Sequence, residues 1–237
     1  MLYRADAMRF WQLHDGGSAA SHSWQQVGGI TSLPATGAHI WLCPLDADAE
    51  LAKLLSEDEK ARAANMQPEK KSREFELARG WLRVLLAAYV EATEPQSIRL
   101  GIAENGKPFS VDHPSLHFNL SHSHECLAVA VSRQNVGIDI EKFRPVPDWR
   151  NLAEGLFTNL VVEAIAALPA AEQDQAFLRH FTAREACLKA AGTGFSRATI
   201  MFEREFHTIA MENHSYAPAF PLPEIPGYVG QICLLTG

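Results

Sequence analysis

The sequence predicts an α+β protein in which helices and strands recur in both halves of the chain. Long amphipathic patterns over residues 69–91 and 171–192 predict two long helices. Short apolar runs that end at turn residues, such as those beginning at His39 and Leu127, predict strands. These elements do not follow the strict strand–helix–strand rhythm of a parallel sheet, which favours α+β over α/β.

Composition limits the classes of function. The chain has 237 residues, of which 47% are hydrophobic and 21% charged, as in ordinary globular proteins. The formal net charge of −7 argues against broad binding to nucleic acid, because no overall positive field exists to attract phosphates. A phosphate-bearing ligand would therefore need a local cluster of Lys and Arg.

The cysteines and the N-terminus predict a cytoplasmic, soluble protein. The four cysteines lie far apart without a C-x-x-C motif, which is typical of reduced, mostly buried thiols rather than disulfides or a zinc site. The first residues contain no signal-peptide core. The most apolar stretch, residues 84–90, is far shorter than the ~18 residues of a spanning helix, so no membrane association is expected.

The N-terminal half is expected to begin with a partly flexible leader over residues 1–37. Residues 16–37 are rich in Gly, Ser and Thr and predict a loop, while residues 1–15 could form a strand that packs onto the body. A strand is expected from His39, and Ser56 with Glu59 has the spacing of a capping box at the start of a helix. The helix over residues 69–91 carries an apolar stripe on one face, formed by Phe75, Ala78, Leu82, Leu85 and Leu86.

Strands and helices continue to the C-terminus. Strand-like runs begin at Ile98, Ser115 and Leu127, and Asn105-Gly106 marks a turn. A second turn at Gln134-Asn135 suggests a boundary between halves of comparable size, residues 38–134 and 135–237. Beyond it we expect a strand over residues 136–143, a helix over 149–168, a stronger one over 171–192, and a strand-like tail. Gly192 and Gly194 are expected to end the stronger helix.

Asp139 and Glu141 are the sharpest chemical signal. In a strand, residues i and i+2 point to the same face, so Ile138 and Ile140 would enter the core while both carboxylates project together. Two close carboxylates repel unless a cation lies between them, and hard oxygen ligands favour Mg²⁺. The alternative is an edge strand with a solvated acidic face, although acids are disfavoured within strands.

Glu185 and Lys189 form the second signal. They stand at i and i+4 on the helix over 171–192, a spacing that also suits a plain surface ion pair. The adjoining Phe177, Phe181 and Leu188 indicate that this part of the helix is partly buried. A half-buried Glu185 could complete a three-carboxylate metal site or act as a base, with Lys189 facing phosphate oxygens.

Two further groups could bind an anion. Lys107 lies beside the predicted tight turn, and Ser121 and His122 lie at a strand end. The histidines at 113, 117, 122 and 124 match no common zinc spacing. Cationic residues on the helix over 69–91, with Arg62 upstream, would supply a positive cluster. A solvated charged face is the usual meaning of such a run. The residues on the helix are Lys70, Lys71, Arg73, Arg79 and Arg83.

Taken in order, these segments resemble the 4′-phosphopantetheinyl transferase family, in its larger single-chain, surfactin-synthetase-activating branch. That family carries G-x-D-x-E, then W-x-x-K-E-A-x-x-K some forty residues later, with a G-K-P turn and an S-H pair upstream. The matching segments span roughly residues 39–200 and are Gly137–Glu141, Phe181–Lys189, Gly106–Pro108 and Ser121-His122. The combination is specific, whereas each motif alone is weak.

The resemblance implies two similar α+β halves related by a pseudo-twofold, with coenzyme A in the cleft between them. It implies that Asp139, Glu141 and Glu185 bind Mg²⁺ together with the pyrophosphate of coenzyme A. It also implies that Lys189, His122 and Lys107, beside Ser121, hold phosphate oxygens, while Arg79 and Arg62 contact the 3′-phosphate and adenosine region.

The expected activity is transfer of the phosphopantetheine arm of coenzyme A to a serine of an apo acyl or peptidyl carrier protein, by a cytoplasmic monomer. Glu185 is the expected base, acting directly or through a metal-bound water, and Asp139 is the reserve. Three positions depart from the family pattern: Phe181 replaces Trp, Arg184 replaces Lys, and Thr193 replaces a frequent Lys. A metal-dependent nuclease or phosphohydrolase and a coenzyme A-binding protein without turnover remain the alternatives.

Overall fold

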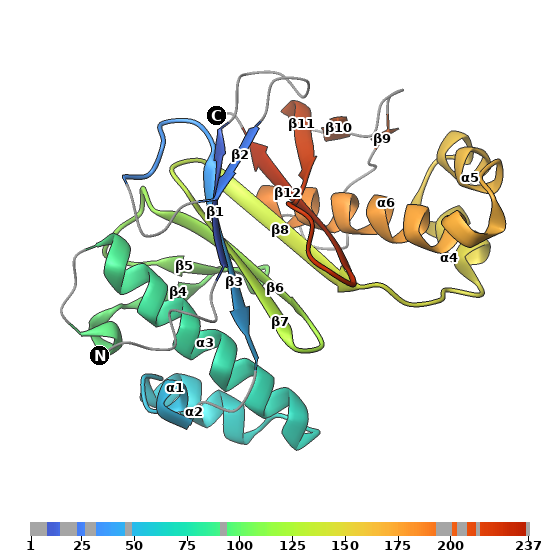
Figure 1. The fold of residues 1–237 in the computed structure, drawn as a ribbon. Helices are drawn as coiled ribbons and strands as arrows, with labels where there is room; N and C mark the ends of the chain where they lie inside the picture. Colours follow the sequence, from blue (N-terminus) through green and yellow to red (C-terminus); the bar gives the residue numbers. More distant parts are fainter. Residues whose placement is uncertain are drawn as a thin grey trace.

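Four layers build the molecule: a helical layer, two antiparallel sheets packed face to face, and a second helical layer (Figure 1). The computed structural model describes residues 9–14, 23–26, 32–45, 49–90, 94–192, 201–202, 208–211 and 214–235. Its mixture of helices and antiparallel sheets confirms the predicted α+β class. Within the described ranges, no helix is both long and apolar enough to cross a membrane.

The first sheet has the strand order β2-β1-β3-β7-β6, and every neighbouring pair is antiparallel. Its central strands, β3 and β7, are almost entirely buried, as their apolar sequences require. The elements of this half are β1 (Arg9–His14), β2 (Ser23–Gln26), β3 (Ala38–Pro44), α1 (Ala49–Ala52), α2 (Glu57–Ala64), α3 (Glu69–Tyr89), η2 (Pro95–Ser97), β4 (Leu100–Ile102), β5 (Pro108–Ser110), β6 (His117–Ser123) and β7 (Cys126–Ser132).

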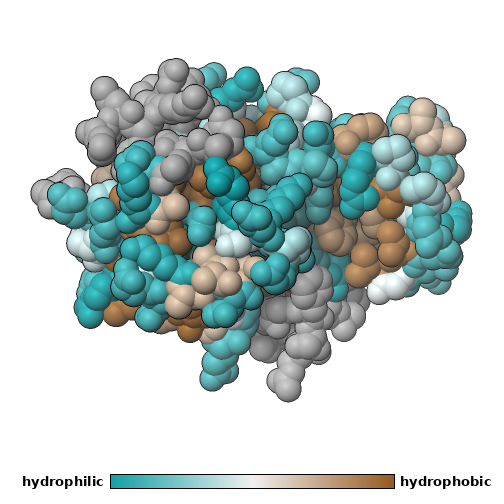
Figure 2. Space-filling model, turned by 90° about the horizontal axis from the view of Figure 1, so that it is seen from below, coloured by the Kyte–Doolittle hydropathy of each residue, from teal (hydrophilic) through white to brown (hydrophobic). Residues whose placement is uncertain are grey.

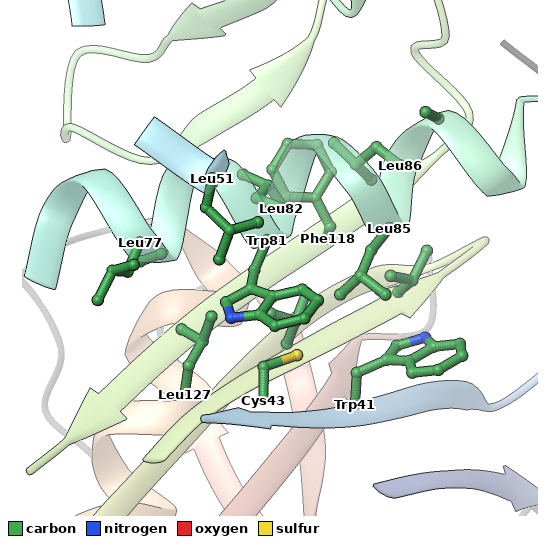
Figure 3. Packing of buried hydrophobic residues seen from close by; sticks show 14 of the residues in the cluster. Trp41, Cys43, Leu51, Leu77, Trp81, Leu82, Leu85, Leu86, Phe118 and Leu127 are labelled. Atoms are coloured by element: carbon green, nitrogen blue, oxygen red, sulfur yellow. The ribbon is translucent and has the colours of Figure 1, made fainter. Parts of the chain in front are cut away.

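Helix α3 covers the outer face of the first sheet, and the predicted apolar stripe makes the contact except at Phe75, which is only partly buried and lies outside this core cluster (Figure 3). Leu82, Leu85 and Leu86 are at most 2% exposed and pack toward Trp41 and Leu127 of the sheet. Each such burial contributes about 1.5–3 kcal/mol relative to an exposed side chain. The helix therefore docks through its sequence pattern, which fixes the position of the cationic residues on its flank.

The second sheet has the order β8-β12-β11-β10-β9, again antiparallel throughout, and α6 crosses its outer face (Figure 1). Helices α4 and α5 pack beside the first half of α6 through a separate apolar cluster. The elements are β8 (Asn135–Lys142), α4 (Trp149–Leu156), α5 (Asn159–Ala166), α6 (Ala170–Ala191), β9 (Met201–Phe202), β10 (Thr208–Met211), β11 (His214–Pro221) and β12 (Tyr228–Leu235).

The inner faces of the two sheets share one core. Ala128 and Ala130 of β7 meet Ile138 and Ile140 of β8, and all four are at most 1% exposed. The isoleucines thus point inward, as the alternation predicts, and the intervening Asp139 belongs to the opposite face, against α6. The strand pattern has therefore placed both acids on the outer side of the second sheet.

The N-terminal leader contains two strands, of which only the second contradicts a prediction, that of a loop over residues 16–37. Residues 9–14 form β1, which pairs with β3, and residues 23–26 form β2 inside the stretch predicted to be a loop. Trp11 and Leu13 of β1 enter the core between the sheets. The Gly- and Ser-rich composition around β2 gives no strand pattern, because the stability of this strand comes from pairing with β1.

The helix predicted over residues 149–168 is two helices. Phe157 has extended backbone angles, φ −128° and ψ 167°, and Thr158 precedes the first residue of α5. Phe157 is buried, with its ring centroid 5.9 Å from that of Phe177 on α6. Packing both short helices against α6 requires this change of direction, which the local sequence does not signal.

The helix ends follow the sequence closely. Ser56 and Glu59 form the predicted capping box, with both reciprocal hydrogen bonds present. Gly192 ends α6 in the left-handed conformation, φ 69°, as predicted for a terminal glycine. The four cysteines are free thiols, and three of them are buried, which confirms that interpretation. The boundary at Gln134-Asn135 falls at the start of β8 and remains a prediction.

Candidate active site

The predicted acidic pair lies where β8 passes between β6 and α6. Asp139 is 6% exposed and Glu141 is partly buried. The hydroxyl of Ser121 donates a hydrogen bond to Asp139 Oδ1 at 2.8 Å, and that of Ser123 donates to Glu141 Oε2 at 3.1 Å. Both carboxylates are thus oriented by hydroxyls from the neighbouring strand.

Lys189 pairs with Asp139 of β8 rather than with Glu185 of its own helix. Its ammonium lies 2.6 Å from Asp139 Oδ1 and 3.2 Å from the carbonyl of Ile138. Glu185 instead accepts a hydrogen bond from Arg184 at 2.9 Å. The i,i+4 surface pair considered from the sequence is therefore wrong: the tertiary packing gives each of these charges a different partner.

Glu185 is more deeply buried than predicted, at 7% exposure. Burial raises its pKa, and the charge of Asp139 raises it further, while Arg184 and Lys189 lower it. A carboxylate in this environment is a stronger base than an exposed one. The helix acid and the strand acid are thus close enough to influence each other electrostatically.

The carboxylates suit a hard cation only in part. Asp139 Oδ2 is a buried oxygen without a hydrogen-bond partner, which a cation or donor would satisfy. Yet among the described residues no three His, Cys, Asp or Glu side chains form a group that could hold a metal ion as they stand. The donor types fit Mg²⁺, and full convergence of the predicted trio stays a prediction.

A cavity of about 340 Å³ lies beside Glu185 and receives residues from both halves of the chain. The first half contributes Arg79, the turn over residues 105–108, Asn119 and Leu120, and the second contributes Glu185, Leu188, Lys189 and Gly192. The structure thereby brings three predicted binding residues, Arg79, Lys107 and Lys189, to one cavity with the predicted base. A larger hollow of about 870 Å³ lies between α6 and residues 221–231 and includes none of the predicted residues.

Arg62 of α2 and Arg79 of α3 both lie against the ring of Phe75. Each guanidinium carbon is 5.3 Å from the ring centroid of Phe75. Arg79 is 6% exposed, its Nη1 is buried without a hydrogen-bond partner, and burial lowers its pKa. A buried guanidinium that lines a cavity in this way is suited to an anionic ligand.

The rest of the basic face divides into two groups. Arg83 is 2% exposed, pairs with Glu59 at 2.8 Å and donates to the carbonyl of Ile98, so its role is structural. Lys70, Lys71 and Arg73 are exposed. The interpretation as a solvated face therefore holds for the first turns of α3 and is wrong for Arg79 and Arg83.

Lys107 crosses from the first half to the second. Its ammonium donates to the carbonyls of Val136 at 2.9 Å and Lys189 at 2.7 Å, and burial lowers its pKa to about 8. Asn105 donates from the same turn to the carbonyl of Gly192. This turn closes the C-terminal end of α6, where unpaired carbonyls favour a cation. A phosphate contact of Lys107 remains a prediction.

His122 alternates with the two serines and has an exposed side chain. Partial desolvation lowers the pKa of its ring, Glu74 and Glu141 act in the opposite direction, and Lys189 lowers it. It therefore lies among the charges at the rim of the site. Thr193, which departs from the family pattern, lies outside the described residues.

Sequence reasoning did not single out three side chains of this region: Ser123, Asn119 and Asn105. The available signal was the alternation N-L-S-H-S in β6, since buried polar residues at i, i+2 and i+4 of a strand need partners on one face. From the sequence, Arg184 is notable only because it replaces the Lys of the family pattern. In the structure it donates a hydrogen bond to Glu185.

Comparison with known proteins identifies the class. Residues 135–221, which contain β8, α6 and all three motif acids, match the model of the 4′-phosphopantetheinyl transferase superfamily. The chain belongs to this family, and it is a 4′-phosphopantetheinyl transferase. The predicted family and enzyme class are thereby confirmed.

Individual relatives show how far the similarity extends. The chain is 34% identical over 184 residues to the 4′-phosphopantetheinyl transferase HetI of Nostoc sp., covering 74% of this chain and 77% of the relative. It is 30% identical over 146 residues to the 4′-phosphopantetheinyl transferase Sfp of Bacillus subtilis, covering 59% and 64%. It is 33% identical over 127 residues to AcpT of Escherichia coli K12, covering 51% and 65%.

Proposed function

We propose that this transferase moves the 4′-phosphopantetheine arm of coenzyme A onto a serine of an apo acyl or peptidyl carrier protein, with Mg²⁺ as cofactor and 3′,5′-ADP as the other product. One observation carries the proposal. The cavity between the halves is lined by Arg79, Lys107 and Lys189 together with Glu185, and Lys189 also pairs with Asp139. This combination is suited to binding a diphosphate and to removing a proton beside it.

The chemistry requires a base and cationic support. The carrier serine oxygen forms a bond to the β-phosphorus, the bond from that phosphorus to the bridging oxygen breaks, and 3′,5′-ADP leaves with the bond's electron pair. Glu185 accepts the serine proton, directly or through a water, because its burial raises its pKa. Asp139 is the reserve base. Lys189 lies within the same charged group and would offset negative charge on the phosphate oxygens.

The cation would be held by carboxylate oxygens. Asp139, with Oδ2 unpartnered, Glu141 and Glu185 supply hard donors from β8 and α6. Bound Mg²⁺ would neutralise charge on the diphosphate and on the leaving group. Because no three-acid group is assembled among the described residues, we propose that the diphosphate completes the coordination.

Coenzyme A would lie along the cavity toward α3. Arg79 and Arg62, stacked about Phe75, would receive the 3′-phosphate and adenosine region. Lys107, Ser121 and His122 would border the phosphates from the first half. We further propose that the protein acts as a cytoplasmic monomer.

The carrier protein would dock on a rim at the end of β8, formed by residues 142–144. Lys142, Phe143 and Arg144 come directly after Glu141, and Phe143 is 44% exposed. Hydrophobic surface also gathers over the end of the molecule formed by α4 and α5, at the right in Figure 2, where Leu152 and Leu160 are exposed. Such an apolar and basic rim suits an acidic carrier domain.

Intact mass spectrometry tests the proposal. An apo carrier protein incubated with enzyme, coenzyme A and Mg²⁺ should gain the mass of one phosphopantetheine arm, and a carrier with its serine changed to alanine should not. Omission of enzyme, or excess chelator, should prevent the gain. Modification that proceeds equally in chelator would refute the metal requirement, and the absence of modification with every class of apo carrier would refute the transfer.

A further inference from the structure

The two sheets meet at a junction that no main-chain ladder bridges. β6 is the last strand of the first sheet and β8 the first strand of the second, and they lie against each other (Figure 1). Side chains of β6 accept the main-chain hydrogen bonds that β8 offers on this edge. Ile138 N–H donates to Asn119 Oδ1 at 2.9 Å, and Lys142 N–H donates to Ser123 Oγ at 3.0 Å.

The junction has a constant register. The three N–H donors on β8, at 138, 140 and 142, each meet the β6 side chain nineteen positions earlier, at 119, 121 and 123. The two strands therefore run in the same direction, and each contact lies two residues beyond the previous one. All three β6 side chains are buried, at 5–8% exposure.

The serines have a second partner that the asparagine lacks. Each serine hydroxyl accepts from one β8 N–H and donates to the carboxylate of the preceding β8 residue, Asp139 or Glu141. For Ser123 the carboxylate oxygen, at 3.1 Å, is a nearer acceptor than His124 Nδ1, at 3.4 Å. The corresponding residue opposite Asn119 is Gly137, which has no side chain. A hydroxyl held by a main-chain N–H has a fixed position, so its proton also fixes the carboxylate it binds.

We infer that Ser123 is a positioning residue of the active site, which orients Glu141 for cation binding as Ser121 orients Asp139. The inference rests on the proposed function, because orientation matters only if these carboxylates hold a cation. It also changes the expected role of Ser121: its one proton is directed to Asp139 Oδ1, so in this geometry it does not donate to phosphate. Ser121 leaves Asp139 Oδ2 as the oxygen without a partner.

The test measures metal affinity in the full chain without coenzyme A, with Mn²⁺ as the probe and electron paramagnetic resonance of free Mn²⁺ as the readout. Ser123→Ala should weaken Mn²⁺ binding about 10-fold, the lower end of the 10–100-fold effect typical of residues that orient metal ligands. Ser123→Thr keeps the hydroxyl and should restore most of the affinity. Ser121→Ala should behave like Ser123→Ala, which provides a second variant should one of them fold poorly.

A matched control separates orientation of the carboxylate from general loosening of the fold. Ser132→Ala removes a buried hydroxyl from the adjacent strand β7, where it donates to the carbonyl of Gly37 and hydrogen-bonds to no carboxylate of the described residues. This change should leave Mn²⁺ affinity unaltered.

The outcomes are distinct. Unchanged Mn²⁺ affinity in Ser123→Ala, or an equal loss in Ser132→Ala, would overturn the inference, because general loosening of the strands would then explain the effect. Failure of Ser123→Thr to recover affinity would also contradict it. If wild-type protein binds no Mn²⁺ and transfers the arm in chelator, the proposed metal dependence itself fails, and the positioning role fails with it for that separate reason.

Discussion

At the scale of the residue, the site is a set of charges whose partners come from distant parts of the chain. Asp139 is bound by Ser121 and Lys189, and Glu185 by Arg184. Each buried charge thus has an opposite charge or a hydrogen-bond donor nearby, which is the condition for keeping carboxylates ionised away from water.

Glu185→Gln should leave the protein folded and lower the rate of transfer at least about 100-fold, because the amide cannot accept the serine proton. The variant keeps the shape of the side chain and its contact with Arg184. Transfer is measured by mass spectrometry of the carrier, and folding by circular dichroism. A rate within a few-fold of wild type would exclude Glu185 as base and ligand.

Lys107→Met should change how stability depends on pH. Burial lowers the pKa of Lys107 from 10.5 to about 8 in the folded chain, so between these values the unfolded chain binds a proton that the folded chain has released. The free energy of unfolding of wild type, relative to the variant, should therefore rise from pH 8 to pH 10. Urea unfolding at several pH values measures this difference.

The control is Lys53→Met, which removes a lysine whose side chain is 67% exposed. A relative stability that stays level or falls across pH 8–10 in Lys107→Met would contradict the assigned burial of the ammonium between the two halves.

At the scale of the element, the close approach of α6 to β8 positions the acids and depends on Gly137. A Cβ at this position would lie 1.9 Å from the carbonyl oxygen of Ala186 and 2.3 Å from the amide nitrogen of Ala190. Neither main-chain atom can move without shifting the helix that carries Glu185 and Lys189. The glycine of the G-x-D-x-E motif is thus required by packing.

Gly137→Ala should therefore destabilise the protein by about 1–3 kcal/mol or more, as overpacking of a filled interior does. Transfer should fall as well, since α6 must move away from β8. Gly155→Ala is the matched control: nothing lies within 4 Å of its added Cβ, and replacing a helical glycine should stabilise by about 0.5–1 kcal/mol. Denaturant unfolding distinguishes the two, and equal effects would argue against the close contact.

At the scale of the whole molecule, the two halves are built alike, each with a long helix on the outer face of a five-stranded sheet (Figure 1). The proposed coenzyme A cavity lies at their junction, and the turn over residues 105–107 ties the first half to the end of α6. Glu141 lies one residue before the end of β8, next to the rim residues Lys142 and Phe143.

Phe143→Asp should raise the KM for the carrier protein severalfold, with little effect on coenzyme A binding, because an acidic residue at the rim would repel an acidic carrier. Val111→Asp is the control, since Val111 is equally exposed, at 44%, but follows β5 in the first half. Steady-state transfer kinetics at varied carrier and fixed coenzyme A give the comparison. An equal effect of both substitutions would place docking elsewhere.

The sequence by itself determined the elements and much of the chemistry. Periodicity located α3, α6 and the alternation of β8, and the capping box and Gly192 fixed helix ends, because these signals are local and repeat with the geometry of the backbone. The order of the motifs was sufficient to identify the family.

Only the tertiary structure decided which charges meet. The pairing of Lys189 with Asp139, the burial of Arg79 and Arg83, the break at Phe157 and the strands β1 and β2 all depend on contacts between residues far apart in the chain. Ser123 became visible as a partner of Glu141 for the same reason: a hydroxyl in a strand has no local preference for a partner eighteen residues away, and the meeting of two sheet edges supplies it.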